Sequence, residues 1–200
     1  MDNFLQQFCQ QLINGVSLGS IYALIALGYT MIYGIIKLIN FAHGDIYMIG
    51  AYFGFFATTQ LGVGFIPAII IAMAGAAVVG IIIERIAYRP MRNAPRIAIL
   101  ITAIGVSFFL EYGMILLVSP QPRTFPAVFA PTVYHMGPLV ANSQQLVILI
   151  SALILMVTLS YIVNSTKAGK AMRAVSSDAD AARLMGINID KVISMTFALG

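Results

Sequence analysis

Residues 12–36, LINGVSLGSIYALIALGYTMIYGII, form an uncharged stretch that is long enough to cross a membrane as a tilted helix. A polar stretch, KLINFAHGD, follows at residues 37–45. A helix of about 20 apolar residues spans the hydrocarbon core of a bilayer. These two stretches therefore predict a membrane helix that ends in a polar interruption.

The composition of the whole chain agrees with a membrane location. Of its 200 residues, 60% are hydrophobic and 9% are charged, whereas soluble domains carry about 25% charged residues. The mean hydropathy is +0.93. This balance excludes a water-soluble enzyme, a nucleic-acid-binding protein and a disordered chain. We expect an all-α, polytopic membrane helix bundle that forms one transmembrane domain over residues 1–200.

Five apolar runs and the start of a sixth are expected as membrane spans. They cover residues 12–36, 46–61, 65–84, 97–118, 145–163 and 192–200. The sixth run stops after nine residues, and nine helical residues reach only about 14 Å, which is less than half of a bilayer core. We therefore expect the sequence to be a fragment or a truncated gene product.

The basic residues predict the orientation in the membrane. They gather in two loops, made of Arg85, Arg89, Arg92 and Arg96, and of Lys167, Lys170, Arg173, Arg183 and Lys191. Two spans separate these loops, so both face the same side, which the positive-inside rule identifies as the cytoplasm. The proline-rich loop at residues 119–143 is then an extended external segment. Counting back places the N-terminus outside, provided that residues 46–61 cross the membrane rather than re-enter it.

Small and aromatic residues recur on one face of the first expected span. Their spacings are 4, 3, 4, 3 and 4, and they comprise Gly15, Gly19, Tyr22, Ala26, Tyr29 and Tyr33. Gly15 and Gly19 form a small-xxx-small pair that permits close helix approach, and Gly50 and Gly54 form a second. Two interpretations remain open: a packing seam, or tyrosines that line a translocation path.

The interruption at residues 40–45, NFAHGD, contains the polar side chains Asn40, His43 and Asp45. Non-helical backbone at membrane depth is tolerated only against protein or a water-filled cavity. The segment is therefore a candidate gate or ion-relay element, and the alternative is an interfacial turn capped by Asp45. A metal site is not expected, because His43 and Asp45 lack a third ligand.

Two glutamates lie in or beside apolar runs. Glu111 lies about 10 Å inside the fourth run, where an ionisable group normally faces the bundle interior. It could bind a substrate ammonium group, be protonated, or pair with a residue of a second subunit. Glu84 lies at the expected cytoplasmic edge beside four arginines, and we expect it to form a solvated salt bridge.

Residues 164–191 form a polar loop that nevertheless carries helix signals. Ser177 is expected to cap a short helix whose first turn contains Asp178 and Asp180, and Gly186 is expected to end it. Either Asn188 or Asp190 is expected to cap the next span. The apolar residues Ala182, Leu184, Met185 and Ile187 suggest a helix that docks on a partner. The loop contains no phosphate-binding motif, so no nucleotide site is expected in this chain.

Three segments closely resemble bacterial branched-chain amino-acid ABC transporter permeases. They are residues 14–52, residues 83–92 (IERIAYRPMR) and residues 186–200 (GINIDKVISMTFALG). Residues 180–186 are similar to the EAA-xxx-G coupling loop of ABC importers. Ala181, Ala182 and Gly186 match that loop and Asp180 replaces its glutamate, but the later Ile-x-Leu-Pro is absent, with Thr196 at the expected isoleucine position.

The resemblance implies a transporter subunit of the bacterial inner membrane that is not an enzyme. It implies a second related permease subunit, an external substrate-binding protein and two cytoplasmic ATPases, which hold the ATP and magnesium. This chain would itself bind no cofactor. The coupling residues would be Asp180, Ala181, Ala182 and Gly186. Candidates for the translocation path are Tyr22, Tyr29, Tyr33, Asn40, His43, Asp45 and Glu111.

Other functions remain open from the sequence. Related permeases carry urea, amides or other amino acids. A proton-coupled secondary transporter would use Glu111 or Asp45 as its proton site. A non-transporting membrane scaffold would need neither. Co-purification of an ATPase would distinguish an ABC permease from a secondary transporter and from a scaffold.

The predicted orientation can be tested by cysteine labelling. In a background with Cys9 replaced by serine, a cysteine within residues 121–130 should react with a membrane-impermeant maleimide added outside intact cells. A cysteine at residue 93 or 94 should react only after the membrane is opened, because its loop faces the cytoplasm. The reverse labelling pattern would contradict the orientation.

Overall fold

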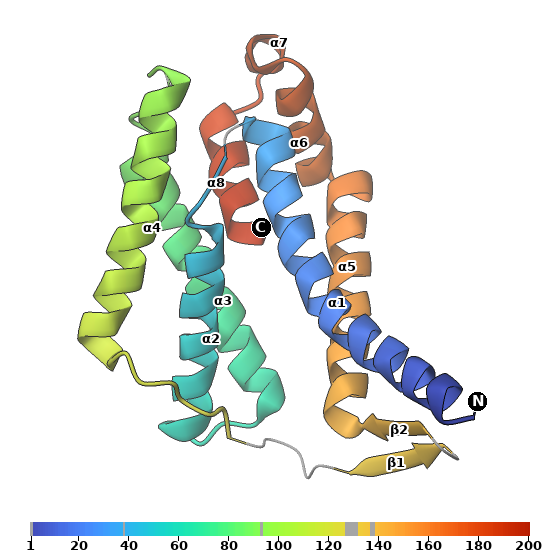
Figure 1. Ribbon diagram of the computed structural model, residues 1–200. Coiled ribbons are helices and arrows are strands. Elements are labelled where there is room, and N and C mark those ends of the chain that lie inside the picture. Colours follow the sequence, from blue (N-terminus) through green and yellow to red (C-terminus); the bar gives the residue numbers. More distant parts are fainter. Residues whose placement is uncertain (1, 38, 93, 127–131, 137–138) are drawn as a thin grey trace.

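The computed structural model describes residues 2–37, 39–92, 94–126, 132–136 and 139–200, and these are mainly helical (Figure 1). The long helices are α1 (Asp2–Ile36), α2 (His43–Thr59), α3 (Phe65–Ile83), α4 (Arg96–Val118) and α5 (Ser143–Ser165). Shorter helices follow as α6 (Lys167–Ser177), α7 (Ala179–Leu184) and α8 (Ile189–Leu199), and a π-helical turn, η1 (Glu84–Tyr88), continues α3.

The expected all-α fold is confirmed, and a short hairpin accompanies the helices. Strands β1 (Val133–Met136) and β2 (Leu139–Asn142) form an antiparallel hairpin between α4 and α5, with Val133 opposite Asn142. This hairpin lies in the proline-rich segment that was expected to be extended. Part of that segment, residues 127–131 and 137–138, lies outside the described residues.

Within the described residues, four helical segments are long and apolar enough to cross a membrane. They are Phe4–Ile36, Phe65–Tyr88, Arg96–Val118 and Ser143–Ser165. The expected second and sixth spans correspond to the shorter α2 and α8. With 17 residues, α2 is about 25 Å long, slightly less than the thickness of a bilayer core.

Local sequence sets several of the helix ends. Asn142 caps α5 in a reciprocal arrangement with Gln145, and Asn188 caps α8 by accepting from the backbone N–H of Lys191. After Ile36, Lys37 takes a left-handed backbone conformation with φ 56°, which ends α1. Helix α1 begins ten residues before the predicted start at residue 12, because residues 2–11, which mix polar and apolar side chains, are also helical.

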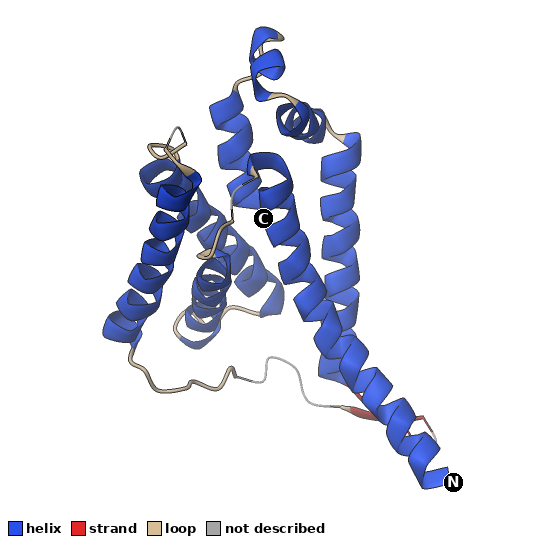
Figure 2. Cartoon of the chain, turned by 45° about the horizontal axis from the view of Figure 1, so that its top comes forward, coloured by secondary structure: helices blue, strands red, loops and turns tan. Residues whose placement is uncertain are grey.

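The helices form two groups that converge at one end of the molecule. In Figures 1 and 2, α1 lies beside α5, while α2, α3 and α4 form the other group. Helix α8 packs against both α1 and α3 and so joins the groups. Helix α6 is held to the end of α1 by a hydrogen bond of 2.6 Å from Ser176 Oγ to the carbonyl oxygen of Gly34.

Small residues allow close contact within and between these groups. A Cβ built on Gly50 would lie 3.3 Å from the Cβ of Ala76, and one on Gly54 would lie 3.6 Å from that of Ala72. This confirms the predicted close approach at Gly50 and Gly54. A Cβ on Gly80 would lie only 2.6 Å from the carbonyl oxygen of Phe197 in α8. Glycine at position 80 is therefore required for the contact between α3 and α8.

Replacing Gly80 by alanine should lower the thermal unfolding midpoint of the detergent-purified protein. The added methyl group meets backbone, and overpacking of this kind costs about 1–3 kcal/mol. Gly105→Ala is the matched control, because a Cβ there meets no atom within 4 Å and alanine favours a helix by about 1 kcal/mol over glycine. Equal midpoints for the two variants would show that the α3–α8 contact is not tight.

Candidate functional site

The polar interruption after α1 lies inside the bundle. His43 Nε2 is 3.1 Å from the carbonyl oxygen of Ile25. Ile25 precedes Ile36, the end of α1, by eleven residues, or about 17 Å along the helix axis. The chain therefore turns back alongside α1 before α2 begins, and non-helical backbone reaches this depth because it is packed against protein.

Buried polar groups hold the interruption in place. The hydroxyl of Tyr88 donates to Asn40 Oδ1 over 2.8 Å, and the Asn40 and Tyr88 residues are only 2% and 3% exposed. The amide nitrogen of Asn40 has no hydrogen-bond partner among the described residues. The ring of Tyr29 meets that of His43 edge-on, with centroids 5.9 Å apart. The structure thus brings together Tyr29, Asn40 and His43, and adds Tyr88.

The structure does not show the alternative in which Asp45 caps α2. Ala42 occupies the N-cap position and makes no side-chain cap bond. Asp45 lies within the first turn, and its carboxylate accepts a hydrogen bond from Ser107 Oγ of α4. The side chain is therefore used to join two helices.

The other candidate path residues lie away from this site. Tyr22 and Tyr33 are 64% and 49% exposed, and Glu111 is exposed on α4, one helical turn beyond Ser107. No atom lies within 4 Å of a Cβ built on Gly15 or Gly19. The described helices therefore do not use the close approach that this glycine pair permits.

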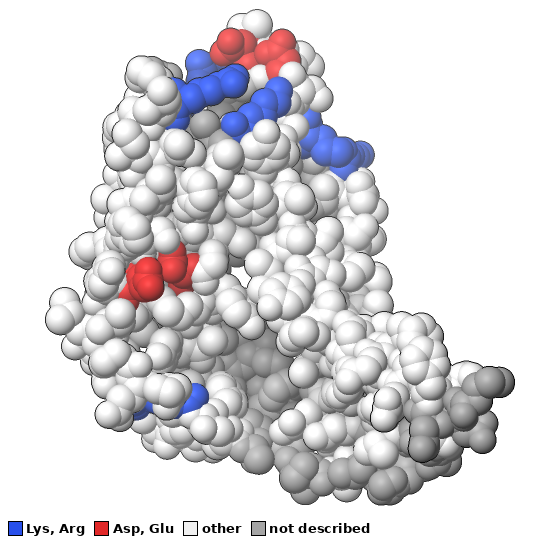
Figure 3. All heavy atoms as spheres, in the orientation of Figure 1, with Lys and Arg blue, Asp and Glu red and all other residues white. Residues whose placement is uncertain are grey.

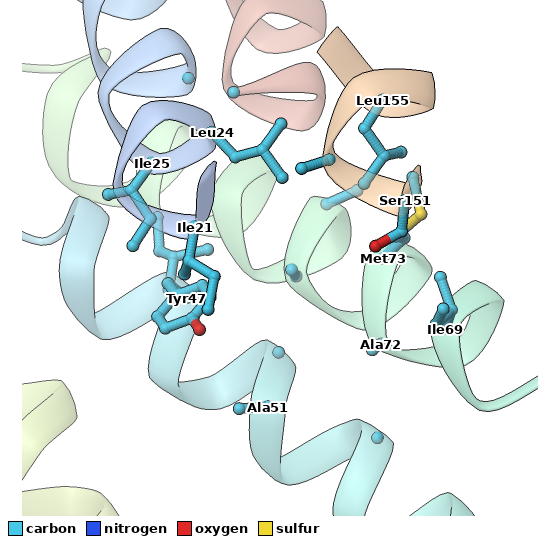
Figure 4. Close-up of a pocket in the computed structure, with 18 of the residues that line it drawn as sticks. Ile21, Leu24, Ile25, Tyr47, Ala51, Ile69, Ala72, Met73, Ser151 and Leu155 are labelled. Carbon is cyan, nitrogen blue, oxygen red and sulfur yellow. The ribbon is translucent and has the colours of Figure 1, made fainter. Parts of the chain in front are cut away.

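A cavity of about 630 Å³ lies beside the interruption, between the α1–α5 and α2–α3 pairs. Figure 4 shows side chains from α1 (Ile21, Leu24), α2 (Tyr47) and α5 (Ser151, Leu155) around this space. His43 contributes to the lining. The volume lies within the range of about 300–1,000 Å³ found for small-molecule sites, and the walls are mostly apolar.

Charged residues join η1 to α8, and here the expectation for Glu84 was wrong. Glu84 is fully buried rather than solvated. Its carboxylate pairs with Arg92 and accepts a 2.6 Å hydrogen bond from Ser194 Oγ. Arg92 also pairs with Asp190, which in turn pairs with Arg89. Ser194 is 110 positions away in sequence, so no local pattern could have revealed this burial.

The Asp190 carboxyl shows the electrostatic effect of its arginine neighbours. Desolvation acts to raise its pKa, but hydrogen bonds from Arg92 and Arg89 and their positive charges outweigh this effect. The pKa therefore lies below its usual value. The carboxylate form that pairs with the arginines is kept at neutral pH, and the pairing is lost only as the pH falls through that lowered pKa.

The polar loop at residues 164–191 folds into α6 and α7. Asp178, not Ser177, caps α7, because its carboxylate accepts from the backbone N–H groups of Asp180 and Ala181. Ser177 instead ends α6. Gly186 follows the end of the helix, as predicted, and takes a left-handed conformation with φ 83°.

The apolar residues of this loop divide between two environments. Ala182 is buried and packs in a cluster with Met172, Val175 and Val192. Leu184 and Met185 are 88% and 83% exposed. Figure 1 shows α7 at the extreme end of the molecule, beyond the long helices. The exposed pair is therefore available for contact with another protein.

Basic side chains concentrate at the end that carries α6 and α7 (Figure 3).

Within the described residues, no group of three His, Cys, Asp or Glu side chains could hold a metal ion.

Comparisons with known proteins cover almost the whole chain. Residues 11–200 match the family described as branched-chain amino acid transport system / permease component. The chain is 43% identical over 209 residues to the high-affinity branched-chain amino acid transport system permease protein LivH of Escherichia coli K12, covering 96% of this chain and 67% of the relative. It is 38% identical over 208 residues to the permease protein BraD of Pseudomonas aeruginosa, covering 98% and 68%. No solved structure matches.

The contact between Tyr88 and Asn40 should contribute measurably to stability. Tyr88→Phe removes the donor and leaves a buried amide oxygen without its partner, which costs about 1–3 kcal/mol. The unfolding midpoint of a fluorescent fusion in detergent should fall. Tyr161→Phe is the matched control, because Tyr161 is 65% exposed and its hydroxyl loss should leave the midpoint unchanged. Equal midpoints would contradict a structural role for this hydrogen bond.

Proposed function

Because this chain belongs to the branched-chain amino acid transport permease family, we propose that it moves leucine, isoleucine and valine across the bacterial inner membrane as one subunit of an ABC importer. Permease is the named role of its relatives, and the four long apolar helices agree with a membrane location. ATP and magnesium would bind to separate ATPase subunits, and this chain would perform no covalent chemistry.

The proposed topology has five spans and the start of a sixth, with the N-terminus outside. Helix α2 is counted as the second span, although it begins inside the bundle. The basic loops and α7 would face the cytoplasm, and Arg123, the basic residue of the opposite loop, would face outside. The gathering of basic side chains at the α6–α7 end supports this orientation (Figure 3).

The proposed translocation path follows the cavity beside His43. Its apolar walls suit a branched aliphatic side chain, because burial of that side chain is favourable. Of the polar groups at the interruption, His43 lines the cavity and would meet a charged group of the substrate as it passes. The Tyr29 ring lies against His43 and Asn40 is buried, so these two would hold the interruption in shape. Tyr22, Tyr33 and Glu111 face away from the described helices, and we assign them to contact with a second permease subunit.

The exposed pair formed by Leu184, the last residue of α7, and Met185, which follows it, is the observation that carries the coupling proposal. Isolated apolar side chains are common on surfaces, but this pair lies at the end of a capped helix at the tip of the molecule. An ATPase that binds α7 can shift the permease from one conformation to another only if it contacts the two conformations differently. Together with Asp180 and Ala181, which are also exposed, the pair would form that contact, while Ala182 and Gly186 fix its geometry.

The test is ATP-dependent uptake by the complete complex, with both permease subunits, the ATPases and the binding protein in liposomes. Labelled leucine should accumulate only with ATP, and unlabelled isoleucine and valine should compete whereas urea should not. Uptake that needs a proton gradient and no ATPase would instead establish a secondary transporter. Competition by urea alone would overturn the substrate assignment.

The double variant Leu184→Ser, Met185→Ser should lose ATPase binding and uptake by roughly tenfold or more, since hot-spot side chains contribute about 2 kcal/mol or more each. Leu61→Ser is the matched control, because Leu61 is 69% exposed but lies in the turn between α2 and α3, at the opposite end of the molecule. Co-purification with the ATPases measures the effect. Normal binding by the double variant would show that α7 is only a connector.

A further inference from the structure

Five residues form a polar cluster at the joint between η1 and α8. They are Glu84, Arg89, Arg92, Asp190 and Ser194, and their contacts run in series from Ser194 through Glu84, Arg92 and Asp190 to Arg89. Two carboxylates face two guanidinium groups, so the cluster is electrically neutral. Glu84 is fully buried, and the Arg92 side chain is 20% exposed.

Such a cluster is a costly way to hold two helices together. Desolvation of a buried ion pair can exceed its Coulombic gain, and apolar residues of similar size often give more stability. A fully satisfied polar network does, however, fix one particular geometry. The π-helical turn that begins at Glu84 also favours a functional role, because such turns frequently occur at functional sites. These features favour a role in positioning.

The cluster lies on a continuous line of contacts from α7 to the interruption in the bundle. Ala182 of α7 packs with Val192 of α8, so α7 and the start of α8 are held together. On the opposite side, Tyr88 of η1 contacts Phe197 of α8, with ring centroids 5.3 Å apart. The same Tyr88 donates to Asn40.

We propose that this cluster is the joint that transmits displacement of α7 to the Asn40–His43 interruption, with Glu84 and Arg92 as positioning residues. The inference rests on the proposed function, in which an ATPase moves α7. When α7 moves, α8 moves with it because Ala182 and Val192 are packed together. The ionic contacts of the cluster then move η1 together with α8. Tyr88 then carries the motion to Asn40. An apolar contact would let α8 slide along η1, whereas paired charges with directional hydrogen bonds resist sliding.

The test measures ATPase binding, ATP hydrolysis and the amount of substrate transported per ATP in the reconstituted complex. Glu84→Gln, Arg92→Gln removes both members of the buried pair and leaves no isolated buried charge at those positions. ATPase binding and ATP hydrolysis should stay at wild-type levels, while substrate transported per ATP should fall about tenfold. A merely structural role would lower the yield of protein but leave that ratio unchanged in the protein that folds. Arg123→Gln, at the opposite end, should keep the wild-type ratio.

Spin labels locate the step that fails. With Cys9 replaced, one label pair at Lys191 and Leu61 reports on α8, and a second at Ile39 and Leu61 reports on the interruption. Binding of ATP and vanadate to the ATPases should shift both distances in the wild type. In the double variant only the α8 distance should shift.

The outcomes separate the two proposals. A wild-type complex that binds no ATPase, or in which neither distance shifts, overturns the proposed function and with it this inference. A double variant with wild-type coupling and both shifts overturns the inference alone. If the double variant does not insert in the membrane, Ser194→Ala, which removes one hydrogen bond to Glu84, should lower the transport ratio several-fold, and an unchanged ratio would overturn the inference.

Discussion

The contact between His43 and the carbonyl oxygen of Ile25 places non-helical backbone well inside the bundle. A lipid-facing backbone group without a partner would cost several kilocalories per mole. Asn40 and Ala42 are accordingly buried, and Tyr88 of η1 donates a hydrogen bond to Asn40. Helix α1 supplies the carbonyl oxygen that meets His43, so two other elements provide partners for the polar side chains of the interruption.

Helix α8 has a central place in the bundle. It packs against α1 and α3, and a Cβ on Gly28 of α1 would lie 2.4 Å from the carbonyl oxygen of Gly200. Glycine at positions 28 and 80 lets the backbone of α8 approach both helices closely. Apolar contacts fill the space between them, with Ile32, Ile193 and Phe197 in one core cluster. The polar joint at Glu84 then fixes how far α8 lies along η1.

The two ends of the molecule differ in chemistry. The end with α6 and α7 carries most of the basic side chains, a short capped helix and two exposed apolar residues. At the other end, Gln10 both donates to and accepts from the backbone of Val140 in the hairpin, over 2.7 and 2.9 Å. One end thus presents exposed apolar and basic side chains, while the other is held to the first helix by hydrogen bonds.

The sequence by itself determined the features that depend on neighbours within one or two helical turns. The lengths of the apolar runs predicted the long helices to within a few residues at most ends. Gly186 was identified as a helix end and Asn188 as one of two candidate caps, and the family was evident from continuous motifs. Even here, the sequence did not show which of two adjacent residues caps α7. Ser177 was expected to do so, but Asp178 is the cap.

Only the tertiary structure decided which polar residues are buried and what they contact. The stripe from Gly15 to Tyr33 defines a helix face, but nothing in it says whether another helix lies opposite. Glu84 resembles a surface residue beside its arginines, yet Ser194 and Arg92 enclose it. Its burial depends in part on Ser194, which is 110 positions away and is brought close by packing. A one-dimensional pattern predicts hydrophobic length and local hydrogen bonds, whereas such distant partners exist only in the folded chain.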